Sequence, residues 1–496
     1  SVLLGHSLIY NKSDAFAGNL SGFPSNSVQV FDGGGVINPN VSGGAYEVSL
    51  QSFFSRINYA YKGKYLLEFN MRRDGSSRFG AANKYGNFPS ASAGWRVSQE
   101  KFMNRINWLS DLKLRASWGI TGNDNIGNYI FEQTYNTNLD YYLGNAVVGA
   151  VALTSLANPT ITWESIKQFD IGMDASLFNN HVSVTADYFK RNSYDVLYTN
   201  FPIPSSIGVT NLAAQNAASM ENSGIELNVN YRGKVADLNY NIGASVSKFA
   251  DNKVTGLGDK GIETINNETI IRIGQPFAAY YGYKVIGIFQ NQTDITNAPK
   301  QFGSNKTAPG DFQYADLSGP GGKPDGVIDA FDRTVIGNPY PKWTYNFNAS
   351  LNYKAFDFNV VFQGVQRIDR LLNDNGQLPM EGDRNNALAY WVNRWTVDKP
   401  SQSLPRLGGV NNSIVSDFYI QDASYLRMKN IELGYTLPRN LVKKFGMQSL
   451  RLYVGGQNLL TFTKMKNFDP ERQRGSGTDQ LAPLYKVYTF GLNVKF

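Results

Sequence analysis

The sequence predicts an all-β fold, a transmembrane antiparallel β-barrel with about fourteen strands in this chain, from three observations. Apolar and polar residues alternate with period two along much of the 496 residues, as they do in strands with one apolar and one wet face. Short turns and long polar segments alternate between these runs, as at the two rims of an outer-membrane barrel. The chain has no cysteine, 13% aromatic residues and only 18% charged residues, which excludes a disulfide scaffold and suits strands that face lipid.

Composition also excludes several classes of function. His6 and His181 are the only histidines, which argues against a multi-histidine metal site or a Ser-His-Asp hydrolase. The net charge of +7 comes from lysines and arginines spread singly, without the basic patch of a nucleic-acid binder. No run reaches the ~20 apolar residues of a membrane-spanning helix, but alternating strands average out in hydropathy. A mean hydropathy of −0.33 is therefore compatible with a barrel.

Each expected strand is an alternating run bounded by turn residues. The run 225–231 (IELNVNY) alternates without a fault, as does 345–353 (YNFNASLNY). In order, the strands are expected near residues 1–12, 46–61, 64–77, 86–98, 110–122, 162–178, 181–197, 219–232, 236–250, 341–354, 356–369, 421–437, 448–460 and 484–496. The link 99–109 is expected to hold a helical turn. The strand-like run 280–290 would break the even count, so it is assigned to a loop.

The links between these strands are of two kinds. Tight turns are expected at 62–63, 179–180, 233–234 and 354–355, and long polar segments at 13–45, 123–161, 198–218, 251–340, 370–420 and 461–483. We therefore interpret residues 1–496 as one barrel portion. Within it, 251–340 and 370–420 are expected to be two long extracellular loop regions.

Several sequence blocks resemble SusC/RagA-type TonB-dependent transporters. The most specific are YLLEFNMRRDGSSRFG at 65–80, YGNFPSASAGWR at 85–96 and LRASWGITGN at 114–123. Further blocks lie at 216–226, 332–339, 424–431 and 454–459. The aromatic end of the last alternating run, Phe496, is similar to the recognition signal of the barrel-assembly machinery. The blocks follow one another in order, so the resemblance covers nearly the whole chain.

The resemblance implies a fold and a function. Proteins of this kind are outer-membrane importers of Bacteroidetes-type bacteria, with a barrel of twenty-two strands around an N-terminal plug. The strands of this chain would be the last fourteen, so no counterpart of the first eight, the plug or the TonB-contacting segment is expected here. The implied function is active import of oligosaccharides or peptides, energised through TonB and assisted by a SusD-like surface lipoprotein. The implied surroundings are outer-membrane lipid, and no enzymatic activity is expected.

A calcium-loop-like motif lies at 316–332. Asp325, Gly326, the carbonyl of Val327, Asp329 and Asp332 follow the later positions of an EF-hand loop, whose hard oxygen ligands suit Ca²⁺. Asp316 and Ser318 would supply the earlier ligands, although an insertion separates Ser318 from Asp325. The sequence thus predicts a structural Ca²⁺ held by Asp316, Ser318, Asp325, Val327, Asp329 and Asp332. The alternative is an acidic turn in which Asp side chains cap backbone N–H groups.

Two further sets of residues are candidates for contact with cargo. Loop aromatics can stack on sugars or contact a lid protein, or simply pack within the loops; the substrate-binding candidates among them are Tyr280, Tyr281, Tyr283 and Trp391. Residues 386–395, around Trp391, are alternatively a helix. Polar strand faces would line a wet interior or a translocation path; their charged residues are Arg56, Glu68, Arg72, Lys113, Arg115, Asp187, Glu226 and Lys248.

Two other functions stay open at this point. One is a structural or secretion-linked barrel that serves as a docking platform. The other is an outer-membrane barrel enzyme such as a protease or lipase, which the two histidines make difficult.

Overall fold

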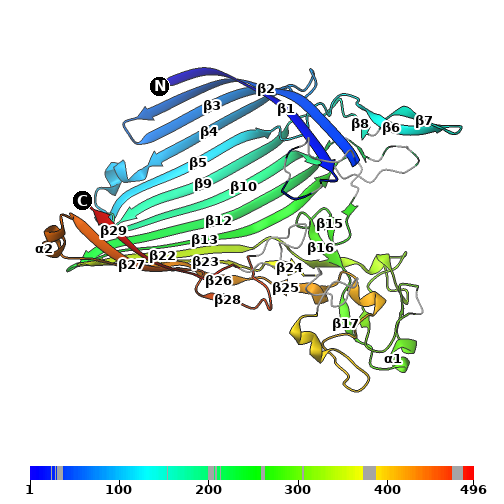
Figure 1. The fold of residues 1–496 in the computed structure, drawn as a ribbon. Coiled ribbons are helices and arrows are strands. Elements are labelled where there is room, and N and C mark those ends of the chain that lie inside the picture. Colours follow the sequence, from blue (N-terminus) through cyan, green and yellow to red (C-terminus); the bar gives the residue numbers. More distant parts are fainter. Residues whose placement is uncertain are drawn as a thin grey trace. The chain divides into compact units, whose positions relative to one another are not determined.

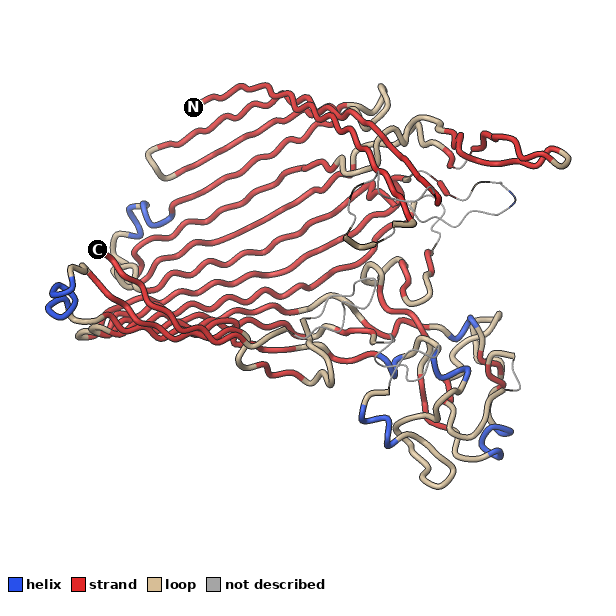
Figure 2. The backbone as a smooth tube through the Cα atoms, viewed as in Figure 1, coloured by secondary structure: helices blue, strands red, loops and turns tan. Residues whose placement is uncertain are grey.

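The computed structural model describes residues 1–23, 25–27, 30, 37–153, 155–198, 206, 209, 211–212, 214–258, 263–303, 306–372, 387–471 and 484–496. Its main feature is a large sheet whose strands pair in the order of the sequence (Figures 1 and 2). The strands along its path are β1 (Val2–Ser21), β2 (Ile37–Tyr61), β3 (Tyr65–Ser76), β4 (Tyr85–Arg96), β5 (Leu109–Asn123), β9 (Glu164–Leu177), β10 (Val182–Tyr198), β12 (Gln215–Val235), β13 (Leu238–Leu257), β22 (Trp343–Tyr353), β23 (Phe356–Gln366), β26 (Tyr425–Thr436), β27 (Ser449–Gln457) and β29 (Val487–Lys495). A short strand, β28 (Thr461–Thr463), pairs with β26 beside this path.

The predicted strands are confirmed in number and order. The described path holds fourteen strands, and the pairs with a described register, such as β1–β2, β22–β23 and β27–β29, are antiparallel. The run 280–290 lies outside the large sheet, as expected, and contributes β16 (Ala279–Gly282) and β17 (Val285–Ile288) to small sheets. Four strands, β1, β2, β12 and β13, are several residues longer than predicted. Their strand pairing continues into residues where apolar and polar side chains no longer alternate.

Tight turns form at 62–63, 179–180 and 354–355, as expected. The turn expected at 233–234 is wrong: these residues lie within β12, and the chain turns instead at Ala236, with φ 51°, and Asp237, because strand pairing continues past Gly233. Lys62 and Gly63 have φ values of 51° and 64°, and Asn179 and Asn180 have 54° and 64°. Positive φ at consecutive residues is the geometry of hairpin turns whose twist matches that of the flanking strands. These turns therefore fix the register of β2 with β3 and of β9 with β10.

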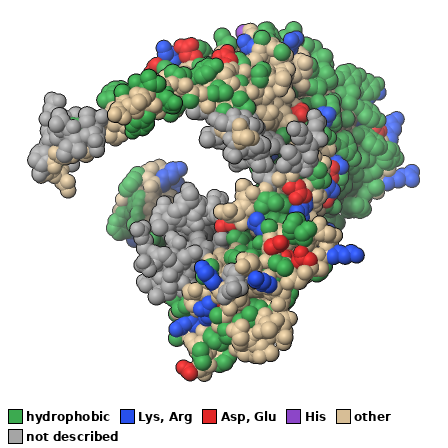
Figure 3. All heavy atoms as spheres, turned by 90° about the vertical axis from the view of Figure 1, so that its right-hand side faces the viewer, with side chains coloured by type: hydrophobic (Ala, Val, Ile, Leu, Met, Phe, Trp, Pro, Cys, Tyr) green, Lys and Arg blue, Asp and Glu red, His purple; other side chains and the backbone are tan. Residues whose placement is uncertain are grey.

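The large sheet has one apolar and one polar face. On β3, Leu67 and Phe69 are 52% and 47% exposed, while the alternate residues Glu68 and Asn70 share a hydrogen bond that Asn70 donates. On β26 and β29, Leu433 and Phe490 are 47% and 80% exposed. Hydrophobic side chains form broad patches on the surface (Figure 3). Apolar surface of this extent indicates a membrane or a partner surface.

The chain divides into two compact units, of which the first comprises Ser1–Ala93, Ser117–Phe169 and Asn192–Ser219. Its core contains Phe79, Phe88 and Trp163. The Trp163 ring lies 5.1 Å from that of Phe79 and 5.3 Å from that of Phe88, and its indole N–H donates to the Lys84 carbonyl over 3.2 Å. This unit also holds the hairpin of β6 (Tyr135–Leu143) and β7 (Ala146–Leu153), and the short pair β8 (Ser155–Leu156) and β11 (Asn211–Leu212).

The second unit comprises Gly94–Ala116, Asp170–Arg191 and Met220–Phe496. Besides its part of the large sheet it contains a region that we call the loop lobe, the described residues of 264–337 and 369–422. The lobe has a four-stranded sheet and three small pairs: β14 (Thr264–Ile265), β15 (Thr269–Ile271), β16 and β21 (Thr334–Gly337); β17 with β19 (Phe312–Tyr314); β18 (Lys300–Gln301) with β20 (Val327–Ile328); and β24 (Asp369–Leu371) with β25 (Ile420–Asp422). The predicted loop 370–420 is described except for 373–386, which lie outside the described residues.

Helices are short. Within the described ranges, the α-helices are α1 (Gln292–Asn297) and α2 (Arg439–Val442), and the 3₁₀ turns are η2 (Val97–Gln99), η3 (Lys101–Met103), η5 (Ala330–Asp332), η7 (Ala389–Asn393), η8 (Val410–Ser413), η9 (Asp417–Tyr419) and η10 (Lys443–Phe445). The helical turn expected in the link 99–109 is thus 3₁₀, and the helix considered for 386–395 is the single turn η7. Among the described residues, no helix has both the length and the apolar character needed to span a membrane.

Candidate functional site

Arg115 on β5 is the centre of a charged cluster on the polar face of the sheet. Its guanidinium lies 2.6 Å from Asp187 on β10, 3.3 Å from Asp170 and 3.2 Å from Asp174, both on β9. Gly172 makes room for it, because a Cβ there would stand 2.2 Å from Asp187 Oδ1 and 2.5 Å from Arg115 Cζ. The sequence placed Arg115 and Asp187 on the polar face; the structure brings them together. One cation among three carboxylates leaves this part of the polar face negative.

Most of the other residues predicted for the polar face also pair there. Arg56 lies 3.9 Å from Glu68. Arg72 lies 2.6 Å from Asp74 and donates to Ser52 over 2.8 Å. Glu226 accepts a hydrogen bond of 3.3 Å from Ser247. Lys113 makes no ion pair with any of these polar-face residues within the described part of the chain. The polar face is therefore a surface of fixed ion pairs and hydrogen bonds.

Lys248 is an exception, and its predicted place on the polar face is wrong. In the register of β13 with β22, Lys248 stands opposite Trp343. The pairs Val246–Tyr345 and Ala244–Phe347 follow at intervals of two residues along both strands, so all three pairs lie on the same face of the sheet. Lys248 therefore shares the apolar face, where its ammonium lies 5.3 Å from the centre of the Trp343 ring. The physical reason is its place at the end of the alternating run, where a long lysine side chain can cover apolar surface and still reach water.

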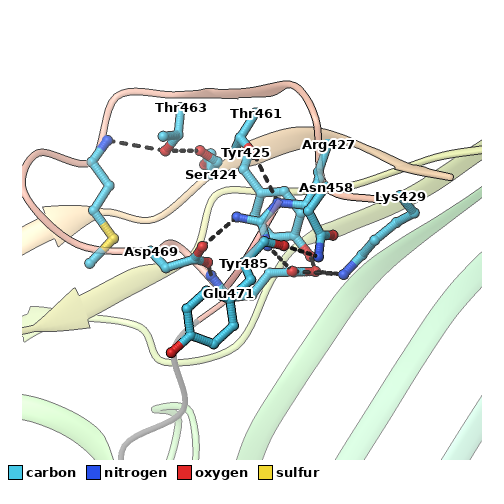
Figure 4. A network of polar contacts seen from close by, with 11 residues as sticks. Ser424, Tyr425, Arg427, Lys429, Asn458, Thr461, Thr463, Asp469, Glu471 and Tyr485 are labelled. Atoms are coloured by element: carbon cyan, nitrogen blue, oxygen red, sulfur yellow. Dashed lines mark hydrogen bonds and ion pairs between the residues drawn. The ribbon is translucent and has the colours of Figure 1, made fainter. Parts of the chain in front are cut away.

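Arg427 on β26 is the centre of a second cluster, seen in Figure 4. Its side chain is 2% exposed. It donates to Thr461 over 2.9 Å and to Asp469 over 2.7 Å, and it pairs with Glu471. Glu471 also accepts from the Tyr425 hydroxyl over 2.5 Å and lies 2.7 Å from the Lys429 ammonium. Two cations and two carboxylates thus balance, and they bind the segment 464–471 to β26.

The partners of Arg427 were not predicted from the sequence. Asp469 and Glu471 fall in the predicted loop 461–483, where no alternation or motif distinguishes them from other polar residues. The sequence offered one indication, an arginine at position 427 within a strand segment. If such an arginine is buried, it requires carboxylate partners, but the sequence does not show which carboxylates these are. A similar arrangement joins Arg451 on β27 to Asp357 and Glu432, at 2.5 and 2.6 Å.

The four predicted cargo-stacking aromatics are buried. Tyr280, Tyr281, Tyr283 and Trp391 are 4%, 5%, 9% and 3% exposed. Tyr283 packs in an aromatic cluster with Phe302 and Tyr314, at ring distances of 5.1 and 5.7 Å, and its burial raises the pKa of its hydroxyl. Burial of this degree favours packing within the lobe, the alternative left open by the sequence. Stacking on cargo stays a prediction for these residues.

The calcium-loop-like segment is held by carboxylates that cap backbone N–H groups. The buried Asp332 accepts from the N–H groups of Leu317, Ser318 and Asp329 at 2.7, 3.1 and 2.8 Å. Asp316 accepts from Asp325 and Gly326 at 3.3 and 2.7 Å.

Asp325 and Asp329 cap their own turns, through Val327 N–H at 3.0 Å and Phe331 N–H at 2.8 Å. Over the described part of the chain, no three His, Asp or Glu residues are grouped so that they could hold a metal ion. Calcium binding by Asp316, Ser318, Asp325, Val327, Asp329 and Asp332 therefore stays a prediction from the sequence.

The two histidines serve local structure. His181 Nδ1 lies 2.8 Å from the Arg232 carbonyl. His6 Nε2 lies 3.3 Å from the Gln51 amide nitrogen, and its ring centre is 4.8 Å from that of Phe53. Neither contact joins a histidine to a hydroxyl nucleophile or a carboxylate, as an acyl-transfer site would require.

The chain is similar to known proteins over almost its whole length. Residues 4–459 match the family model described as "TonB dependent receptor-like, beta-barrel". The chain is 34% identical to TonB-dependent receptor P3 of Formosa agariphila, over 97% of this chain and 49% of that protein. It is 28% identical to TonB-dependent receptor SusC of Bacteroides thetaiotaomicron, over 90% of this chain and 44% of that protein.

Solved structures agree with the sequence comparison. A structure of the RagAB peptide transporter covers 100% of this chain, with a TM-score of 0.83 and 27% identity, and the match occupies 53% of that chain. A structure of the RagAB peptide importer in its open-open state gives a TM-score of 0.83 at 28% identity. The chain thus spans about half the length of the proteins to which it is similar.

Proposed function

This chain belongs to the TonB-dependent receptor-like β-barrel family, and from that premise we propose that it forms the strand wall of an outer-membrane importer of nutrient oligosaccharides or peptides. It is an outer-membrane protein of the SusC/RagA type. The observation that carries the proposal is the sheet of fourteen consecutive strands with opposed apolar and polar faces, matched over its whole length by the RagAB structures.

The polar face has the properties that a wall around a passage needs. Arg115, Arg427 and Arg451 each bind carboxylates on neighbouring strands or segments. Charges paired in this way hold their side chains in place, and a fixed polar surface can meet a hydrated cargo or a polar domain inside a barrel. The opposite, apolar face suits contact with lipid, where the backbone groups of paired strands are satisfied by their neighbours in the sheet.

The energy source and the partner are parts of the same proposal. Import against a gradient across the outer membrane would draw on TonB, through a plug region that this chain does not represent. A SusD-like surface lipoprotein would sit on the loop lobe and deliver cargo. Similarity to a structure named as a peptide transporter supports a peptide cargo, and the oligosaccharide class is proposed from the resemblance of the sequence to SusC/RagA-type transporters.

Uptake in cells tests the proposal. A strain without the full-length transporter, and the same strain carrying it on a plasmid, would be given labelled oligosaccharides and labelled peptides. We expect uptake of at least one class only with the transporter, and loss of that uptake when TonB is deleted. Equal uptake in all strains would contradict import.

Co-purification separates import from the alternative of a docking platform. The tagged full-length transporter should retain a SusD-like lipoprotein after mild detergent extraction. Large secretion partners without a lipoprotein, together with unchanged uptake, would favour the platform. No arrangement among the described residues favours the enzyme alternative.

A further inference from the structure

A cavity lies in the second unit where strands of the large sheet meet the loop lobe. Its volume is about 1120 Å³, and its lining includes Lys342, Tyr345, Arg367, Leu426, Phe462 and Lys464. Trp343 begins β22, Gln366 ends β23 and Tyr425 begins β26, so the cavity is at the strand ends that lead into long segments. In an outer-membrane barrel this is the extracellular rim.

The register places Tyr345, Leu426 and Phe462 of the lining on the apolar face, whereas Tyr425 of the lining stands opposite Val365 and its hydroxyl reaches Glu471 on the polar face. Gly364 on β23 stands opposite Tyr345 on one side and Leu426 on the other, and Leu426 stands opposite Phe462 on β28. Tyr345 is two residues from Phe347, which is 41% exposed on the apolar face, and Phe462 is 59% exposed. A Cβ at Gly364 would lie 2.3 Å from the Tyr345 ring, so this ring covers the strand at that point. Tyr345, Leu426 and Phe462 therefore give the cavity an apolar side that is continuous with the membrane-facing surface of the sheet.

The lining contains three exposed cations and two carboxylates. Among the described residues, Lys342, Arg367 and Lys464 make no ion pair with a carboxylate. The two carboxylates of the lining are already engaged: Asp369 accepts from the Asn338 N–H over 2.8 Å, and Asp422 accepts from the N–H of Ser424 over 2.9 Å and also from its hydroxyl.

A ligand of matching chemistry has an anionic head and an apolar tail. We propose that this cavity binds the phosphate head of a phosphorylated glycolipid of the outer leaflet, whose acyl chains then lie along the apolar face below Tyr345 and Phe462. A phosphate offers several acceptor oxygens to Arg and Lys donors, and cations at the membrane surface attract anionic lipid heads. A soluble cargo would meet the polar face instead, so the lipid is the better match. This inference rests on the outer-membrane location of the chain and does not depend on import.

The test uses the full-length transporter purified in a nonionic detergent. The variant carries K342Q, R367Q and K464Q together, and the matched control carries K234Q, K443Q and K444Q, three exposed lysines at the short-turn ends of the strands. The probes are lipid A, the same lipid without its phosphates, and inorganic phosphate. Binding is measured by native mass spectrometry and by a fluorescence titration with labelled lipid A.

We expect lipid A to bind the K342Q/R367Q/K464Q variant about 100-fold more weakly than wild type, and the control variant within about threefold of wild type. Inorganic phosphate at equal concentration should not compete, because it lacks the tail. Equal affinity of the cavity variant, or equal binding of the dephosphorylated lipid, would overturn the proposal. Full competition by inorganic phosphate would overturn it too, in favour of a soluble-anion site. Unchanged heat-dependent migration of all variants on gels shows that they are folded.

Discussion

Replacing Arg427 with alanine should release the segment 464–471 from β26. Arg427 is 2% exposed, and its partners Asp469 and Glu471 are 13% and 15% exposed. Water reaches these carboxylates poorly, so the positive charge of Arg427 stabilises their ionised form. Removing one partner of a buried ion pair costs about 3–5 kcal/mol. Glu471 keeps Tyr425 and Lys429, which places the expected loss at the lower end, about 3 kcal/mol.

Hydrogen exchange of the segment measures this loss directly. The Lys466 N–H donates to the Gln421 side chain over 3.0 Å, and the Glu471 N–H donates to Asp469 over 2.9 Å, so both amides are protected while the segment is bound. A loss of about 3 kcal/mol in the free energy of local opening makes their exchange about 100-fold faster. The experiment uses the full-length transporter in nanodiscs, with peptides that cover 464–471.

Two variants make the interpretation specific. Lys429→Gln removes a cation that is 29% exposed and contacts Glu471 alone in this cluster, so exchange should rise by less than about fivefold. Arg427→Met combined with Asp469→Asn and Glu471→Gln removes all three charges and should restore part of the protection. Exchange of Lys466 in Arg427→Ala within threefold of wild type would refute the view that this cluster holds the segment.

Three further predictions concern the loop lobe. Asp332→Ala removes the acceptor of three backbone N–H groups and should destabilise residues 316–332 by about 3 kcal/mol, seen as faster proteolysis there. The effect should be equal in EDTA and in Ca²⁺, and an effect confined to Ca²⁺ would favour a metal site instead. Gly282→Ala should weaken the lobe's thermal stability, because its Cβ would lie 2.4 Å from the Val415 carbonyl oxygen. Gly287→Ala is the control, with 3.6 Å to its nearest neighbour, and equal effects of the two would contradict this reasoning. Asp369→Asn should stabilise the lobe more at about pH 7.5 than at about pH 4. Burial raises the pKa of Asp369, so the folded protein binds a proton at this carboxyl more tightly than the unfolded chain does. As the pH rises and the carboxyl ionises, the buried charge lowers the free energy of unfolding, and the asparagine variant avoids this loss. Urea unfolding at the two pH values measures this difference, and equal effects would contradict it.

The strands of the large sheet were predictable because alternation is a local property of the sequence. A run such as 345–353 carries its two faces in its own residue order, and its pairing with the next run follows from a tight turn. Lys248 shows the limit of this method. At the end of a run, a lysine is counted as polar by type, although its alkyl chain lies on the apolar face beside Trp343.

The clusters and the lobe could be predicted only in part, because their contacts join residues that are distant in the sequence. Arg115 was recognised as a polar-face residue, but its distances to Asp170 and Asp174 depend on the stagger of β5 and β9. Tyr283 and Trp391 were recognised as loop aromatics, but their burial depends on how two long segments pack. An aromatic residue in a polar segment has the same local pattern whether it binds a sugar or fills a core.

The packing of the loop lobe has a consequence for how such a protein can change its cargo. Tyr280, from the segment between β13 and β22, packs in one core with Leu371 and Tyr419, from the segment between β23 and β26. Trp395 similarly packs with Phe312. The two segments therefore fold on each other, and a segment transplanted alone from a relative would meet a foreign partner surface. Recombination between relatives, in the laboratory or in evolution, should preserve folding when both segments are exchanged together, so their sequences are expected to diverge as a pair.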